Sequence, residues 1–480
     1  MIFGIEIGVF IFLILCLLLV GIFEFINGFH DTANAVAPVI YTKSLKAKYA
    51  IMIAGFMNFL GVFLGGIGVA MAIIYLLPLE AITYQSTTFG IIVVISLLLS
   101  AIIWNFSTWY FGLPASSSHS LIGAILGVTI SMLYIPMNGN IEVIPNWDKA
   151  IEVIESLLFS PFVGFMLATI IMYFSFKFIK NRYYFKKPSK KYNSHPKKSL
   201  RIILILTSAW VSFAHGSNDG QKGVGLSMLI LVLLAPNIFS INPNINLDDV
   251  NKNIHSIETS LELVNLDLLN DSEKDNFNKL KINLLNIKQD INSSDKIDKG
   301  ELRKEILSFK NNINSLNKTI SGDNGRLYIV SVVNSNNKIV NNNLIDTNIT
   351  SILSIIDYAP IWIILFISIS LGLGTMIGRK RIVVTIGEKI GKTSMSYVQA
   401  TTSALITAIT ITVASKFHLP VSTTHILSSS VAGTMSIGNK SSGVRGTTVK
   451  NILLAWILTL PVTMFLSGFI FLSLWFLLIK

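Results

Sequence analysis

The sequence contains little charge and almost no cysteine. Only 13% of its 480 residues are charged, whereas ordinary soluble domains have about 25%. Cys16 is the single cysteine, which excludes an intramolecular disulfide. Hydrophobic residues make up 51% of the chain, and its mean hydropathy is +0.62. This composition indicates a membrane protein.

Apolar runs long enough to cross a bilayer, which takes about 20 residues, recur along the chain. Seven long runs lie at 7–27, 50–77, 89–111, 156–180, 358–378, 394–415 and 450–479, and three shorter ones at 119–135, 200–214 and 223–239. We therefore expect an all-α polytopic membrane protein in which some helices are broken or re-entrant. The first run lacks a basic start and a small-residue cleavage site, so we expect it to remain in the mature protein.

One polar unit occurs twice within this apolar sequence. NGFHDTANAVAP at 27–38 is followed by LPASSSH at 113–119, and FAHGSNDGQKGVG at 213–225 is followed by LPVSTTH at 419–425. Each copy places an aspartate, Asp31 or Asp219, before a hydroxyl-rich turn that ends in histidine. An ionisable group at membrane depth indicates a functional site, and two copies of the whole unit make coincidence a poor explanation.

The second copy contains a long insertion. Asp31 and His119 are 88 positions apart, whereas Asp219 and His425 are 206 apart, a difference of 118. Residues 241–350 hold 24 asparagines and 15 of the chain's 26 acidic residues, a composition foreign to a membrane. Apolar residues recur there at spacings of three and four, which predicts three amphipathic helices, with apolar positions at 254, 257, 261, 264 and 268, then 277, 280, 284, 287 and 291, then 306, 309, 313, 316 and 320.

Basic residues in the short loops predict the orientation of the chain. The 177–201 connection carries ten lysines and arginines, and smaller basic clusters lie at 43–48 and 379–381. By the positive-inside rule these segments are cytoplasmic, so the helix leading to Asp31 runs inward and the one leading to Asp219 runs outward. Repeats of opposite orientation are typical of secondary transporters that bind their substrate at the midplane. Anionic lipid explains the basic loop, so we expect no nucleic-acid partner.

The predicted organisation follows from these observations. It comprises a first membrane repeat (1–176), a basic cytoplasmic loop (177–201), the start of a second repeat (202–239), an extracytoplasmic helical insert (240–357) and the remainder of the second repeat (358–480).

Each hydroxyl-rich turn combines a proline with residues that favour helix N-caps. A helix N-terminus presents unpaired N–H groups and about half a positive charge, so two such ends suit a tetrahedral oxyanion. Phosphate fits, sulfate fits nearly as well, and a carboxylate would leave donors unpaired. Interhelical hydrogen bonding would explain a single cluster, but two with the same frame favour binding. The predicted phosphate ligands are Ser116, Ser117, Ser118, Ser422, Thr423, Thr424, Asn34, Asn218 and Gln221.

The aspartates have a complementary role. A carboxylate desolvated at this depth favours its protonated form, so we predict that Asp31 and Asp219, with His119 and His425, serve a coupling proton or cation. Neighbouring glycines permit each helix to unwind and free backbone carbonyls, and these are Gly28, Gly216, Gly220 and Gly223. No two histidines of these motifs are spaced as metal ligands on one helix face, so no dedicated metal site is predicted. Lys222 matches Asn34 in position, and pairing with an aspartate, pairing with the anion and snorkelling to an interface all stay open.

Motifs spread over nearly all the membrane part carry a family resemblance. They are GFHDTANAVAPVIY, LPASSSHSLIGAILG, FAHGSNDGQKGVGLSML, YAPIWI with GLGTMIGRKR and TIGEKIGK, and LPVSTTHILSSSVAGTM. In these segments the chain resembles the inorganic phosphate transporter (PiT) family, and within it the bacterial low-affinity phosphate permeases.

The resemblance implies an inverted-repeat fold, a homodimer, and two re-entrant helical hairpins that bind phosphate. Sodium-coupled members carry a glutamate at the position of Asn58, so this departure favours a proton as the coupling ion. Similar permeases take up phosphate as a neutral complex with Mg2+, Ca2+ or Zn2+. A metal of this kind would travel with the substrate and contact Asp31 and Asp219, and no resident cofactor is expected.

We therefore predict a transporter rather than an enzyme, located in the bacterial inner membrane, that imports inorganic phosphate by proton symport with alternating access. Alternatives are a sulfate carrier or a sodium-coupled phosphate carrier of the same fold, and a phosphate-sensing membrane receptor.

Overall fold

The structure is a computed structural model. It describes residues 5–83, 85–113, 115–137, 143, 145–188, 196–262, 271–292, 298–321, 349, 351–377, 394–437 and 444–480, without the side chains of 32–34, 80, 260, 262, 272, 273 and 314–321. The chain divides into two compact units. Met1–Ile230 and Pro360–Lys480 form the first, here called the membrane unit, and Leu231–Ala359 form the second, here called the insert unit.

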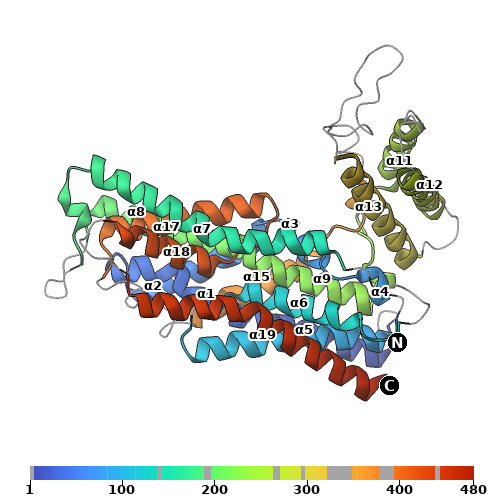
Figure 1. Cartoon of the computed structure of the whole chain (residues 1–480), viewed down its shortest axis with the longest axis horizontal. Coiled ribbons are helices and arrows are strands. Elements are labelled where there is room, and N and C mark those ends of the chain that lie inside the picture. The colour runs from blue at the N-terminus through green and yellow to red at the C-terminus, as the bar shows by residue number, and fades with distance from the viewer. Residues whose placement is uncertain are drawn as a thin grey trace, which may run out of the picture. The chain divides into compact units, whose positions relative to one another are not determined.

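The described part of the membrane unit is almost entirely helical, as Figure 1 shows. Its elements are α1 Ile7–Tyr41, α2 Ala47–Leu64, α3 Gly68–Ile74, α4 Leu79–Thr83, α5 Thr87–Tyr110, α6 Ser117–Met132, α7 Trp147–Phe178, η2 Arg182–Phe185, α8 Lys198–His215, η3 Gly216–Gly220, α9 Gln221–Leu234, α15 Ile361–Ile377, α17 Tyr397–Lys416, α18 Thr423–Ser436 and α19 Gly446–Leu478. Within the described residues, seven helices are long and apolar enough to cross a membrane, and α6 and α15 are shorter apolar helices. The prediction of an all-α polytopic membrane protein is confirmed.

Two details of the helices differ from the apolar runs. The 50–77 run forms two helices, α2 and α3, because Gly66 between them has a φ of +81°, a conformation that glycine adopts without strain. Conversely, the run at 200–214 and the part of the 223–239 run up to Leu234 belong to one continuous helical segment, Lys198–Leu234. The five-residue π-helical turn η3 joins α8 to α9 there, so the Asp219 motif widens the helix instead of interrupting it.

The expected break at Gly28 is absent. α1 continues as a single helix of 35 residues from Ile7 to Tyr41. A Cβ at Gly28 would lie 2.8 Å from the backbone nitrogen of Thr375, so this glycine lets α1 approach α15 closely. A Cβ at Gly216 would similarly lie 2.9 Å from the carbonyl carbon of Asn58, on α2. These glycines therefore serve helix contact, and α1 frees no carbonyls by unwinding.

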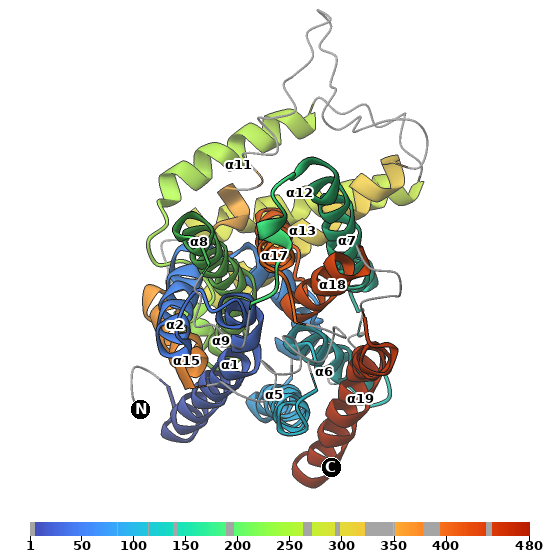
Figure 2. The same ribbon diagram turned by 90° about the vertical axis from the view of Figure 1, so that its left-hand side faces the viewer.

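The long helices of the membrane unit form three groups of neighbours, which Figure 2 shows nearly end-on. One group contains α1, α2, α8 and α15, a second contains α5, α6 and α19, and a third contains α7, α17 and α18. Large apolar side chains on α7 and α19, such as Phe159, Phe162, Phe465 and Phe469, are exposed on the outside. Such a surface suits lipid.

The short helices α6 and α18 begin directly after the two hydroxyl-rich turns. Ser116 and Ser422 are the N-caps, and each hydroxyl accepts a hydrogen bond from the backbone N–H of the histidine three residues later, at 3.2 Å in both helices. Nearly every residue of α6 and of α18 is buried. The sequence motif thus places two capped helix N-termini inside the membrane unit.

The insert unit contains the helices that its apolar spacing predicted. They are α11 Leu247–Glu262, α12 Asp271–Asn292 and α13 Lys299–Ser321, preceded by the short α10 Pro236–Phe239. Ile254, Ile257, Phe277, Ile287 and Phe309, all predicted apolar positions, are buried. Val264 and Leu268 lie outside the described residues, as do the side chains of Leu316 and Ile320. The predicted boundary at 240–357 compares with Leu231–Ala359 for the compact unit.

Candidate functional site

The two aspartates, which are distant in sequence, lie on either side of one histidine. The Nε2 atom of His215 is 3.3 Å from Oδ2 of Asp31 and 3.1 Å from Oδ2 of Asp219. All three side chains are almost completely buried. Asp31 is supplied by α1, whereas His215 and Asp219 are supplied by α8 and its π-helical continuation η3. The site thus begins as a pair of carboxylates that share one imidazole.

Hydroxyls of the second turn hold these carboxylates. Thr424 donates a hydrogen bond of 2.6 Å to Oδ1 of Asp31, and Thr423 donates one of 3.0 Å to Oδ2 of Asp219. The Nδ1 atom of His30 is also 3.2 Å from Oδ1 of Asp31. The N-terminus of α18 is therefore tied to both aspartate motifs.

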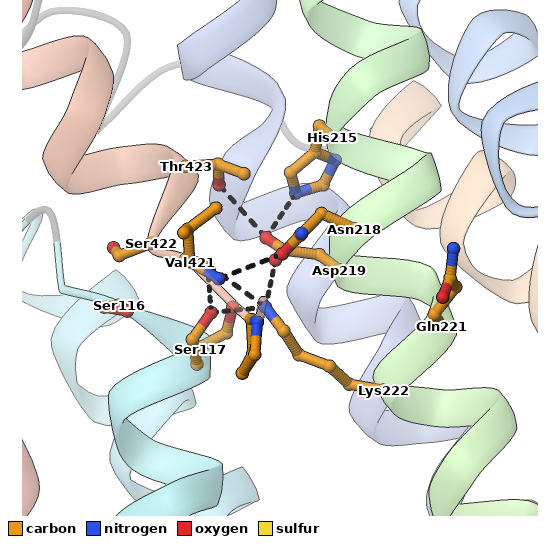
Figure 3. Close-up of polar contacts among 12 residues, drawn as sticks. Ser116, Ser117, His215, Asn218, Asp219, Gln221, Lys222, Val421, Ser422 and Thr423 are labelled. Carbon is orange, nitrogen blue, oxygen red and sulfur yellow. Dashed lines mark hydrogen bonds and ion pairs between the residues drawn. The ribbon is translucent and has the colours of Figure 1, made fainter. Parts of the chain in front are cut away.

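Lys222 connects the second aspartate to both turns. Its ammonium contacts Oδ1 of Asp219 and the hydroxyl of Ser118, and it lies 3.3 Å from the carbonyl oxygen of Val421 (Figure 3). Ser118 in turn donates to the same Val421 carbonyl at 2.8 Å. Three acceptors match the three N–H donors of an ammonium group. The question left open by the sequence is answered here, since Lys222 is buried beside Asp219 and does not snorkel.

The two hydroxyl-rich turns meet at this point. Ser118 lies in the first turn and Val421 in the second, so their hydrogen bond joins the N-terminal ends of α6 and α18. The first N–H groups of a helix have no intrahelical acceptor and carry the positive end of its dipole. Ser117, Ser422 and Thr423 are buried around this junction, which Figure 3 shows. Two electropositive helix ends and one ammonium therefore converge on a buried position.

A chain of hydrogen bonds fixes the orientation of His215. Thr375 donates to the carbonyl of Leu371 at 2.8 Å, so its hydroxyl accepts from Nδ2 of Asn58, also at 2.8 Å. The amide oxygen of Asn58 then faces Nδ1 of His215 at 3.0 Å, which makes Nδ1 the donor. Nε2 is left between the two carboxylates, where it presents either a second proton or a lone pair directed at a bound cation.

The predicted coupling histidines lie elsewhere. The rings of His119 and His425 face each other with centroids 4.5 Å apart, and His425 stacks on Trp456 at 3.9 Å. Nδ1 of His119 pairs with the Ser116 hydroxyl at 2.8 Å. These contacts place both rings behind the helix N-termini, next to each other. The coupling role predicted for them stays a prediction, and His215 occupies the position between the carboxylates.

Asn218 and Gln221, predicted as phosphate ligands, bond to protein groups. Asn218 donates to the Leu419 carbonyl at 3.0 Å and accepts from the Val421 N–H at 3.2 Å, so it holds the second turn in place. Gln221 donates to two backbone carbonyls and accepts from the Val69 N–H at 2.8 Å. Figure 3 shows its side chain apart from the Asp219 cluster. The side chain of Asn34 lies outside the described residues, so its assignment stays a prediction.

Asp31, His215 and Asp219 also form a group suited to a cation. One ligand atom from each lies within 4.8 Å of the others. Carboxylate oxygens and imidazole nitrogen are common ligands of Zn2+, and carboxylates also suit Mg2+ and Ca2+. The sequence signal for this group was the spacing of four residues from His215 to Asp219, which places both on one face of a helix. Spacings between pairs of histidines do not reveal this group, because the partner of His215 on the helix is an aspartate.

Buried helix N-termini beside a π-bulged helix are typical of membrane transporters. Residues 27–467 match the sequence model of the Phosphate transporter family, and the chain belongs to this family. It is 42% identical to the low-affinity inorganic phosphate transporter of Buchnera aphidicola subsp. Acyrthosiphon pisum, with 95% of each chain covered. It is 36% identical to the low-affinity inorganic phosphate transporter PitB of Escherichia coli, with 97% of each covered.

A solved structure supports the fold. The structure titled "The sodium-dependent phosphate transporter" matches with a TM-score of 0.53 and 19% identity, covering 97% of this chain and all of the other. At this identity the match shows the fold alone. The family resemblance inferred from the motifs is confirmed, and membership in a transporter family agrees with the prediction that the chain is not an enzyme.

Proposed function

We propose that this protein imports inorganic phosphate across the bacterial inner membrane by proton symport. The observation that carries the proposal is the meeting of two capped helix N-termini, from distant parts of the chain, around one buried ammonium. Helix N-termini bind phosphate through backbone N–H groups and the helix dipole. An ammonium adds a full charge that a phosphate oxygen accepts directly.

Binding of phosphate requires an exchange of partners. In this structure Thr423 and Thr424 donate to carboxylates, and Ser118 donates to a carbonyl. A phosphate between α6 and α18 would accept these hydroxyls, and the aspartates would then need another cation or a proton. This exchange links substrate binding to the uptake of positive charge. It gives a physical reason for coupling, because two carboxylates and a phosphate in one buried site repel each other.

A divalent metal would satisfy the same requirement. If phosphate enters as a complex with Mg2+, Ca2+ or Zn2+, then Asp31, His215 and Asp219 offer ligands for the metal while the helix ends hold the phosphate. The metal is then part of the cargo.

Alternating access is proposed from the same arrangement. The two aspartate motifs and the two turns come from the two predicted repeats of opposite orientation, so rocking of one repeat against the other would expose the site to either side in turn. A homodimer is part of this proposal because the family resemblance implies it.

Transport into liposomes tests this function. The purified protein would be reconstituted, and 32P-labelled phosphate uptake measured under an inward proton gradient or an inward sodium gradient, each with and without Mg2+. We expect the proton gradient to drive accumulation and an excess of sulfate to leave uptake unchanged. Accumulation driven only by sodium would reject proton coupling, and labelled sulfate uptake at the same rate would reject phosphate selectivity.

Substitution of the turn hydroxyls tests the site itself. Thr423→Val and Thr424→Val keep the shape of each side chain and remove its hydroxyl. Thr401→Val is the matched control, because Thr401 donates only within α17, to the Tyr397 carbonyl at 3.0 Å. We expect the first two variants to weaken uptake and the control to transport normally. Equal rates in all three would contradict the proposed site.

The single buried cysteine allows a clean test of topology. Lys252, in α11 of the insert unit, has a side chain that is 78% exposed, and Lys187 lies on the surface of the 177–201 connection. A membrane-impermeant maleimide applied to intact cells should label Lys252→Cys and spare Lys187→Cys. The reverse pattern would show that the insert is cytoplasmic.

A further inference from the structure

Glu24 is a buried carboxylic acid that the transport site leaves unused. It lies on α1, seven residues before Asp31, and is completely inaccessible to solvent. Seven residues make nearly two helical turns, so Glu24 and Asp31 share one face of α1, about 10 Å apart along the helix axis. Its one signal in the sequence is a glutamate within the 7–27 apolar run, which no repeated motif accompanies.

The contacts of this carboxyl group are few. Nδ2 of Asn27 donates to Oε2 at 3.2 Å, and Oε1 has no hydrogen-bond partner among the described residues. The group lies directly against the backbone of α9, since a Cβ at Gly223 would be 2.6 Å from Oε1. Gly223 immediately follows Lys222, so Glu24 borders the segment that carries the site.

The environment supports the neutral form of Glu24. An ionised carboxylate in a buried site costs several kcal/mol unless it is paired and fully hydrogen-bonded. Asp31 and Asp219 meet that requirement through His215, Lys222 and the threonines, whereas Glu24 has one neutral amide donor. The titratable groups that act on Glu24 are Asp219, Lys222 and His215. Helices α5 and α15, which also pack against α1, contain no Asp, Glu, Lys, Arg or His.

We propose that Glu24 carries the coupling proton. This inference rests on the proposed proton symport and assigns its carrier to a residue outside the phosphate site. Neutral Glu24 fits the structure as it stands. Loss of its proton creates an anion beside α9 that competes with Asp219 for Lys222, and Lys222 holds the two turns together. Protonation of Glu24 and closure of the turns around phosphate are coupled through that ammonium, and the proton is taken up on one side and released on the other.

Exchange and net transport separate this role from phosphate binding. Vesicles loaded with unlabelled phosphate exchange it for external 32P-labelled phosphate without net proton movement, whereas accumulation from a pH gradient requires proton release. Glu24→Gln mimics the protonated acid permanently. We expect this variant to exchange phosphate at nearly the wild-type rate and to lose accumulation. In the wild type, one coupled proton gives about tenfold accumulation of phosphate per pH unit, since each factor of ten equals about 1.4 kcal/mol. In the variant, the internal phosphate concentration should rise only to the external one.

Two further variants complete the test. Glu24→Asp keeps a titratable group and should retain part of the accumulation. Glu6→Gln, the same chemical change at an exposed position just before α1, should behave as wild type. An internal pH dye should report acidification during uptake by wild type and none by Glu24→Gln.

Several results would overturn the inference. Wild-type accumulation by Glu24→Gln would remove Glu24 from coupling, and loss of exchange in the same variant would make it part of phosphate turnover. If sodium drives the wild type and Glu24→Gln loses that response, the bound ion is sodium and not a proton. If no proton gradient drives even the wild type, the proposed symport fails, and this outcome is visible before any variant is compared.

Discussion

The buried ion pair of Lys222 and Asp219 allows a direct test of the proposed site, because its contribution to the stability of the protein can be measured. Lys222→Met keeps the length of the side chain and removes its charge, which leaves Asp219 with His215 and Thr423 as partners. Breaking a buried ion pair by removing one partner costs about 3–5 kcal/mol, because the remaining charge stays buried with less compensation. Asp219→Asn should cost a similar amount, since it strands Lys222.

The double variant distinguishes a true pair from two independent residues. With Lys222→Met and Asp219→Asn together, no charge is stranded, so the loss of stability should be smaller than the sum of the single losses by about 2 kcal/mol or more. A pair on the surface of α7, Lys149 and Glu152 at 2.7 Å, is the matched control. Its cycle should give a coupling of about 0.2–1 kcal/mol, as exposed pairs do.

Cys16 makes the measurement simple. It is the only cysteine in the chain and is 1% exposed, so a thiol-reactive fluorophore reacts with it when the helices separate. Thermal unfolding followed in this way should show midpoints lowered by about 6–20 °C in each single variant, given about 3–5 kcal/mol and about 2–4 °C per kcal/mol in mid-sized domains. Additive losses in the double variant would refute the assignment of Lys222 as the partner of Asp219.

Three other outcomes are expected. Asp31→Asn and Asp219→Asn should abolish 32P uptake while the protein remains in the membrane fraction, because each removes a carboxylate that holds a turn hydroxyl; wild-type uptake in either would refute these roles. Asn58→Leu should reduce uptake without loss of membrane protein, since it removes the amide oxygen that accepts from Nδ1 of His215, and unchanged uptake would show that the orientation of His215 is unimportant. Ser422→Ala should lower the unfolding midpoint by the equivalent of about 1 kcal/mol through loss of the α18 N-cap, and an unchanged midpoint would show that the cap contributes nothing.

Part of the site could be predicted because the motif is repeated. Two copies of an aspartate followed by a proline and hydroxyls identified Asp31, Asp219 and the turns, and the structure brings these segments together. Composition and apolar periodicity were sufficient for the helical fold and for the three helices of the insert unit. Local rules work in these cases since N-caps, apolar faces and helix-length runs are properties of short segments.

The remainder depends on contacts between distant segments. Whether Lys222 reaches an interface or Asp219 is decided by Ser118 in α6 and by Val421 in the turn before α18. The position of Glu24 beside the site depends on its close contact with Gly223 on a different helix. The expected break at Gly28 was wrong for the same reason, because glycine permits both unwinding and close helix approach, and the proximity of α15 selects the second.

The two halves of the site differ in charge despite their common motif. The first motif has Asn34 three residues after its aspartate, where the second has Lys222. The second carboxylate therefore has its own built-in cation, whereas the carboxylate of Asp31 depends on hydroxyl and imidazole partners. A phosphate that takes Thr424 from Asp31 and contacts Lys222 would leave the first half in greater need of positive charge. Glu24 lies on the same face of α1 as Asp31 and against α9 at Gly223, so the proton that we assign to Glu24 acts from outside the phosphate site, through the charge balance at Lys222.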